Sequence, residues 1–140
     1  GLAVGIVVIL VAQFFVNFKI SYIPITLLII IFSSILFSMC GFLNGLFAND
    51  WDDINIIPTF IMTPLTYLGG IFFSISMLPD FWQGLALANP ILYLINGLRF
   101  GMLGISDVSI YLSFLIIVSA LLIMFYLCLY YLNNGRGLRY

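Results

Sequence analysis

Nine charged residues divide the chain into long stretches that carry no charge. They are Lys19, Asp50, Asp52, Asp53, Asp80, Arg99, Asp107, Arg136 and Arg139. A helix that crosses a membrane needs about 20 mainly apolar residues, and the ranges 23–47, 55–78 and 109–132 meet this requirement. A charge at the centre of a bilayer costs about 2.5–3.5 kcal/mol on insertion scales. Charges placed near the ends of these ranges therefore predict an all-α, polytopic membrane protein.

The composition excludes most soluble functions. Only 6% of the residues are charged and 64% are hydrophobic, whereas a soluble domain usually carries about 25% charged residues. A soluble enzyme or a nucleic-acid-binding protein is therefore excluded. The sequence contains no histidine, and Cys40 and Cys128 both lie inside apolar runs. We expect no catalytic centre, no metal site and no cofactor bound by this chain.

The apolar run at 1–17 begins without Met and without a charged leading segment, so it does not read as a signal peptide. We interpret it as the remainder of a truncated transmembrane helix, which makes the chain the C-terminal part of a longer protein. With the three ranges above, the prediction is four transmembrane helices within a single domain over residues 1–140.

The range 80–104 is apolar but does not read as a span. Gln83 and Asn89 interrupt it, and Pro90 divides it into two pieces. Pieces of about ten residues fit a pair of short re-entrant or interfacial helices between the last two spans. Pro90 suits the first turn of the second helix, where its missing N–H is not needed.

Four polar residues share one face of this second helix at 3.6 residues per turn, and they are Asn89, Tyr93, Asn96 and Arg99. Such a face needs water, lipid headgroups or a cavity lined by protein. Two interpretations stay open. The helix lies at the interface and faces headgroups, or it lines the extracytoplasmic mouth of a pathway.

The C-terminal tail indicates an orientation. Residues 133–140 contain Arg136 and Arg139 and no acidic residue, so the positive-inside rule places the C-terminus in the cytoplasm. Three alternating spans then place the turn at 48–55 in the cytoplasm and residues 79–108 outside.

The turn at 48–55 carries three acidic residues, Asp50, Asp52 and Asp53. Negative side chains stabilise the start of a helix by capping and by the helix dipole. Capping explains these residues, and contact with a cytoplasmic partner is the alternative.

Small residues form a stripe on the 23–47 helix, namely Ser34, Ser38, Gly41 and Gly45. Small side chains allow the close helix approach that drives association in lipid. The stripe predicts packing within the subunit, and a dimer interface is the alternative.

Two prolines lie in the 55–78 helix. Pro58 falls in its first predicted turn and is tolerated there. Pro64 lies deeper, so we expect a kink and a freed carbonyl that Thr63, Thr66 or a neighbour could satisfy.

No source of energy for transport is visible within the predicted spans. Every Asp lies between spans, which excludes an intramembrane aspartyl protease and leaves no ionisable group at mid-membrane for a proton-coupled carrier. A transport function therefore needs a partner subunit to supply energy.

The segment from Ile54 to Gly104 resembles the C-terminal half of type-2 ABC exporter permeases. The family pattern joins a Pro-containing span to a Gly-rich turn, a Phe-Phe pair, a Leu-Pro, an Asn-Pro and an Arg before Leu-Gly. The matching residues are Leu68, Gly69, Gly70, Phe72, Phe73, Leu78, Pro79, Trp82, Gln83, Asn89, Pro90, Arg99, Leu103 and Gly104.

The resemblance implies a multi-pass protein of the bacterial inner membrane with six transmembrane helices. This chain would hold most of the third helix and the fourth to sixth. Family members form dimers and work with a separate cytoplasmic ATPase, which binds ATP and Mg²⁺. The expected function is the permease subunit of an exporter. A non-transporting structural or assembly protein is the alternative, and a secondary transporter ranks third because no coupling-ion site is visible.

Overall fold

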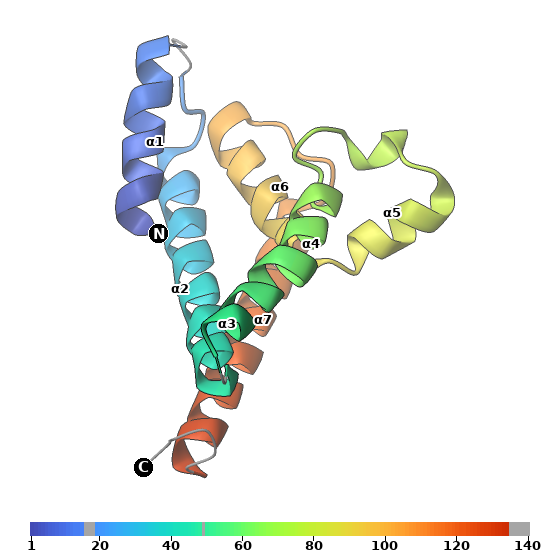
Figure 1. The fold of residues 1–140 in the computed structure, drawn as a ribbon. Coiled ribbons are helices and arrows are strands. Elements are labelled where there is room, and N and C mark those ends of the chain that lie inside the picture. Colours follow the sequence, from blue (N-terminus) through green and yellow to red (C-terminus); the bar gives the residue numbers. More distant parts are fainter. Residues whose placement is uncertain (16–18, 49, 135–140) are drawn as a thin grey trace.

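The computed structural model describes residues 1–15, 19–48 and 50–134 (Figure 1). Across these ranges the ordered elements are all helical, which confirms the all-α prediction. In chain order they are α1 (Leu2–Phe15), α2 (Ile23–Phe47), α3 (Trp51–Ile56), the π-helix η1 (Ile57–Met62), α4 (Thr63–Leu68), the 3-10 helix η2 (Ile75–Met77), α5 (Asp80–Leu87), α6 (Pro90–Leu103) and α7 (Ile110–Asn133).

Among the described residues, two helices are long and apolar enough to cross a membrane, α2 with 25 residues and α7 with 24. Their bounds agree closely with the predicted ranges 23–47 and 109–132. Both helices leave large apolar side chains exposed, for example Ile31 and Leu122. Apolar exposure of this extent is costly in water and is accommodated by lipid.

The core is built around α6, which packs against both α2 and α7. Figure 1 shows α6 beside α2 at the end of the bundle where α2 begins. Leu92 and Leu94 of α6 are buried together with Ile29 of α2 and Ile117 of α7. The short helix is therefore an internal element of the bundle.

The contact between α2 and α6 depends on two glycines of α6. A Cβ atom at Gly101 would lie 2.9 Å from the backbone nitrogen of Thr26, and one at Gly97 would lie 2.8 Å from Cδ1 of Ile29. Absence of side chains at these positions lets the two backbones approach closely. At the same end, the N–H groups of Ser21 and Tyr22 donate to the carbonyls of Met102 and Gly101 at 3.1 and 2.8 Å.

The predicted 55–78 span is wrong at both ends. Three continuous helical elements, α3, η1 and α4, run from Trp51 to Leu68, and we call them the rod. The rod begins early because Asp50 is the N-cap and forms a capping box with Asp53. It ends at Gly69, and Gly70 has a φ of 80°, a conformation that favours glycine.

Pro58 consequently lies inside the rod and not in its first turn. It belongs to η1, where the helix widens to π-type pairing. After the rod the chain forms a loop that contains η2 and leads to α5, which projects to the side of the bundle (Figure 1).

Two predicted ranges fall partly outside the description. The helix predicted at 1–17 is observed as α1, which lies beside α2, and residues 16–18 are outside the described ranges. The predicted tail at 133–140 is described only to Asn134, so Arg136 and Arg139 also lie outside them.

Candidate functional site: a polar face on α6

The polar face of α6 consists of Asn89, Tyr93, Asn96 and Arg99, as the helical spacing predicts. Its first member starts the helix, because Oδ1 of Asn89 accepts a hydrogen bond from the N–H of Ile91 at 3.0 Å. Asn is a favoured N-cap, and Pro90 fits the turn that follows. Asn89, Tyr93 and Asn96 are 2%, 5% and 3% exposed. The face is therefore directed into protein.

The first two members bind the elements that precede α6. Nδ2 of Asn89 donates to the carbonyl of Leu65 in α4 at 2.6 Å. The hydroxyl of Tyr93 donates to the carbonyl of Leu87 at the end of α5 at 2.7 Å. These bonds connect the start of α6 to α4 and α5.

Asn96 fixes the loop that joins α6 to α7. Its Nδ2 donates to the carbonyl of Val108 at 2.9 Å and to Oγ of Ser113 at 3.0 Å. Its Oδ1 accepts from the N–H of Asp107 at 2.9 Å and from that of Val108 at 3.3 Å. The side chain thus uses both donors and both acceptor positions, as a buried amide must.

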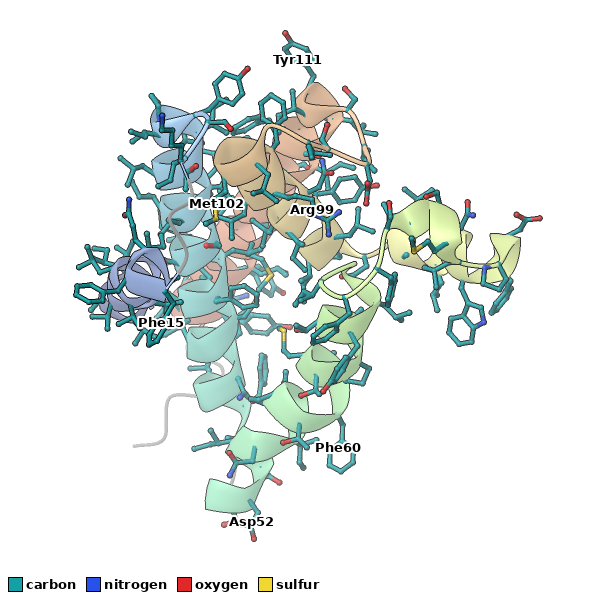
Figure 2. The ribbon with its side chains drawn as sticks, turned by 90° about the horizontal axis from the view of Figure 1, so that it is seen from above. Phe15, Asp52, Phe60, Arg99, Met102 and Tyr111 are labelled. Carbon is teal, nitrogen blue, oxygen red and sulfur yellow. The ribbon has the colours of Figure 1, made fainter. Side chains whose placement is uncertain are left out.

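Arg99 joins two loops at the end of the face. Its Nη1 lies 2.7 Å from Oδ2 of Asp107 in the α6–α7 loop, and the two side chains are 22% and 18% exposed. Its Nη2 donates to the carbonyl of Gly70 in the loop after the rod. Figure 2 shows Arg99 on the side of α6 that faces α5.

Asp107 is held in its charged form. Burial raises the pKa of this carboxyl, but the hydrogen bonds from the Ser74 side chain, the Ile75 N–H and Arg99, together with the positive charge of Arg99, outweigh it. The pKa of Asp107 therefore lies below its usual value, and the ion pair persists at neutral pH.

The side chains of the polar face therefore link α6 to neighbouring elements. It holds α4, α5, the loop after the rod and the α6–α7 loop against α6. The first three members are surrounded by protein groups, while Arg99 is partly exposed. A face toward headgroups stays a prediction. A role in lining a pathway stays a prediction. The described residues contain no group of His, Cys, Asp or Glu side chains that could hold a metal ion.

The acidic turn forms the start of the rod. The Asp50 N–H donates to Oδ2 of Asp53 at 3.3 Å, and the Asp50 side chain accepts from the backbone of Asp53. Capping thus accounts for two of the three acidic residues, while Asp52 is exposed. Contact with a partner stays a prediction.

The small-residue stripe on α2 is open over most of its length. Ser34 lies near α1, because a Cβ atom at Gly1 would be 3.5 Å from its Oγ. Ser38 is exposed, and a Cβ atom at Gly41 or Gly45 would meet nothing within 4 Å. Packing within the subunit and a dimer interface both stay open.

Pro64 lies in α4, directly after the π-helical segment. The Thr63 hydroxyl donates to the Pro58 carbonyl at 3.0 Å, and the Thr66 hydroxyl donates to the Met62 carbonyl at 2.7 Å. Neither carbonyl is that of Phe60, which an α-helix would pair with the N–H missing at Pro64, so satisfaction of the freed carbonyl by a threonine stays a prediction. The departure from α-helical pairing lies upstream of Pro64, in η1.

Sequence reasoning missed four residues of structural importance. Gly97 and Gly101 repeat the spacing of Gly41 and Gly45 and were detectable by the same pattern. Asp107 follows Arg99 across a helix end, but its pairing depends on the loop conformation. Asn44, which is buried, donates to the Ile54 carbonyl at 2.8 Å; a lone polar residue in an apolar helix is the available signal.

Comparison with known proteins identifies the class. Residues 1–103 match the family model described as ABC-2 type transporter. The chain belongs to this family.

The similar relatives are bacterial permeases. The chain is 46% identical over 139 residues, 99% of its length, to the inner membrane transport permease YadH of Escherichia coli K12. The same identity holds for the YadH proteins of Escherichia coli O157:H7 and Shigella flexneri. The match covers 54% of each relative, so the chain spans about half their length. No solved structure matches it.

Proposed function

We propose that this chain is part of the membrane-spanning permease subunit of an ATP-driven exporter in a bacterial inner membrane. The observation that carries the proposal is 46% identity over 99% of the chain to an inner membrane transport permease. Membership of the ABC-2 type transporter family supports it. The permease supplies the pathway, and a separate cytoplasmic ATPase that binds ATP and Mg²⁺ supplies the energy.

In the proposed topology, α1, α2, the rod and α7 cross the membrane, and α5 and α6 form a re-entrant pair. The apolar exposure of α2 and α7 supports the first part. The position of α6 between α2 and α7, with its backbone close to α2 at Gly101, supports the second. The C-terminus and the acidic turn lie in the cytoplasm, with residues 79–108 outside.

Two partners belong to the proposal. A second copy of the permease completes the pathway, with the open stripe at Gly41 and Gly45 as a candidate contact. The cytoplasmic ATPase contacts the full-length permease, and the exposed Asp52 is a candidate contact within this chain. Contacts in the half of the relatives that this chain does not cover complete the coupling.

The test is reconstitution of the full-length permease in lipid vesicles with the ATPase encoded by a neighbouring gene. A panel of lipid-linked glycans, polysaccharides and drugs is screened for stimulation of ATP hydrolysis and for ATP-dependent movement across the vesicle membrane. We expect stimulation and movement only when both subunits are present. Movement of a substrate down its gradient by the permease alone would contradict the exporter function.

The alternative, a structural or assembly protein, predicts a different result. It predicts a complex with other membrane proteins and no substrate that stimulates ATP hydrolysis. The same reconstitution therefore distinguishes the two functions.

A further inference from the structure

Near the N-terminal (lower) end of the rod, one backbone carbonyl lacks the N–H donor that an α-helix would provide. In an α-helix the carbonyl of Ile54 accepts from the N–H of residue 58, and residue 58 is a proline without an N–H. Nδ2 of Asn44 in α2 donates to this carbonyl at 2.8 Å. A side-chain amide from the preceding helix thus takes the place of the lost backbone donor.

The upper end of the rod repeats this arrangement. The carbonyl of Leu65 would accept from the N–H of Gly69, but that N–H donates to Thr66 at 3.1 Å, because the helix ends there. Nδ2 of Asn89 donates to the Leu65 carbonyl at 2.6 Å. Both Asn44 and Asn89 are buried, so each amide is committed to its carbonyl.

Between these two bonds the rod makes few contacts with the rest of the described chain. No side chain from Asp52 to Leu68 is buried, and the segment Ile57–Met62 has π-helical pairing. Pro58 and Pro64 remove two backbone donors from the same region. π-helical segments are rare and occur often at functional sites.

We propose that Asn44 and Asn89 are positioning residues that clamp the two ends of the rod, and that the rod bends at the π-helical segment between them. The two asparagines bind backbone carbonyls of the rod. They therefore fix the position of its two ends relative to α2 and α6 without restricting its side chains. Figure 2 shows Phe60, in the middle of this segment, pointing away from the bundle. Within the described part of this chain, a bend at this segment breaks no packed core.

The first test is a double-mutant cycle in the full-length protein. Asn44→Ala removes the amide donor, and Pro58→Ala restores a backbone N–H that can pair with the Ile54 carbonyl. Amide hydrogen exchange is measured across residues 51–68 and, for comparison, across 110–133. We expect Asn44→Ala to accelerate exchange in the rod roughly fivefold, the factor that one net hydrogen bond gives to a local opening. In the Pro58→Ala background the same change has little effect.

A second variant tests the upper end. Asn89→Ser retains an N-cap acceptor for Ile91 but is too short to reach the Leu65 carbonyl. We expect faster exchange in the upper part of the rod. The matched control is Ser119→Ala, which removes an exposed hydroxyl bonded to Ile116 of its own helix and should leave the rod unchanged.

A distance measurement keeps the inference testable if a variant is too unstable for exchange. Spin labels at Phe60 and Tyr111, which are 73% and 84% exposed, report the position of the rod relative to α7 in a cysteine-free background. We expect a broader distance distribution in Asn44→Ala and in Asn89→Ser than in the parent.

Three results would overturn the clamp. They are additive effects of Asn44→Ala and Pro58→Ala on the rod, equal acceleration in residues 110–133, or unchanged exchange and distance distributions in both asparagine variants. The clamp itself does not depend on the proposed function. Only the use of the bend in transport rests on that function. If the expected exchange pattern is observed without ATP-dependent transport, the clamp stands and the proposed function fails.

Discussion

At the residue scale, the buried side-chain amides are paired with backbone groups of other elements. Asn44, Asn89 and Asn96 each donate to a carbonyl outside their own helix. An unsatisfied polar group in an apolar environment costs several kcal/mol, so these side chains fix which loop or helix end lies beside them. Polar residues are rare in this chain, and each of these three therefore has a large influence on the arrangement.

The first prediction concerns Asp107. Its pKa is lower in the folded state, so the carboxylate contributes stability above the unfolded pKa of about 3.9, and the contribution is lost as the pH falls through the folded pKa. We expect Asp107→Asn to lower the melting temperature of the full-length protein at pH 7. The difference from the parent should shrink as the pH is lowered below 4. A difference that stays constant down to pH 2 would contradict this assignment.

The second prediction concerns the α2–α6 contact. Gly101→Ala should destabilise the fold by about 1–3 kcal/mol, the usual cost of overpacking, because the new Cβ atom meets the backbone of Thr26. Gly45→Ala is the matched control, since a Cβ atom there meets nothing within 4 Å. Denaturation of both variants in the same detergent gives the comparison. Equal stability of the two would refute the close contact.

At the element scale, the sequence predicts the long helices well and the rod poorly. Apolar length and charge position define α2 and α7, because both features are local. The ends of the rod depend on the Asp50–Asp53 capping box and on the turn at Gly69, which compete with an apolar run that continues to residue 78. Hydropathy does not register a turn made of glycine and phenylalanine, so the predicted span was too long.

The α6 face shows the same division. Helical periodicity predicts that Asn89, Tyr93, Asn96 and Arg99 share one side, and each of them bonds to a group outside α6. It does not predict their partners, because Leu65, Val108 and Gly70 contribute backbone carbonyls whose positions depend on the tertiary fold. Backbone groups carry no sequence signal, and side-chain patterns alone could not distinguish a buried face from an exposed one.

The third prediction addresses the prolines of the rod. Pro64→Ala restores an N–H directly after the π-helical segment, so the α-helical part of the rod should extend toward Phe60 and exchange more slowly there. If bending of the rod is part of transport, the proposed ATP-dependent export should slow as well. Unchanged transport with slower exchange would separate the proline from the mechanism.

At the scale of the whole molecule, Arg99 holds two loops together, whereas Lys19 is exposed outside the helices. The fourth prediction is that Arg99→Ala in the full-length permease reduces ATP-dependent export at least tenfold. Lys19→Ala, which removes the same charge, should retain near-parental export. Reconstituted transport with equal amounts of folded protein is the measurement. Near-parental export in both variants would remove Arg99 from the mechanism.

The backbone bonds from Ser21 and Tyr22 to the end of α6 have a consequence for biosynthesis. The two bonded segments are separated by about 80 residues in the chain, and translation proceeds at about 5–20 residues per second. The amide groups of Ser21 and Tyr22, directly before α2, therefore wait roughly 4–16 s for their partners. During that interval water must satisfy them, so α2 should pause with its first turn at the membrane surface. The final placement of α2 in the membrane is thus timed by the emergence of α6 from the ribosome.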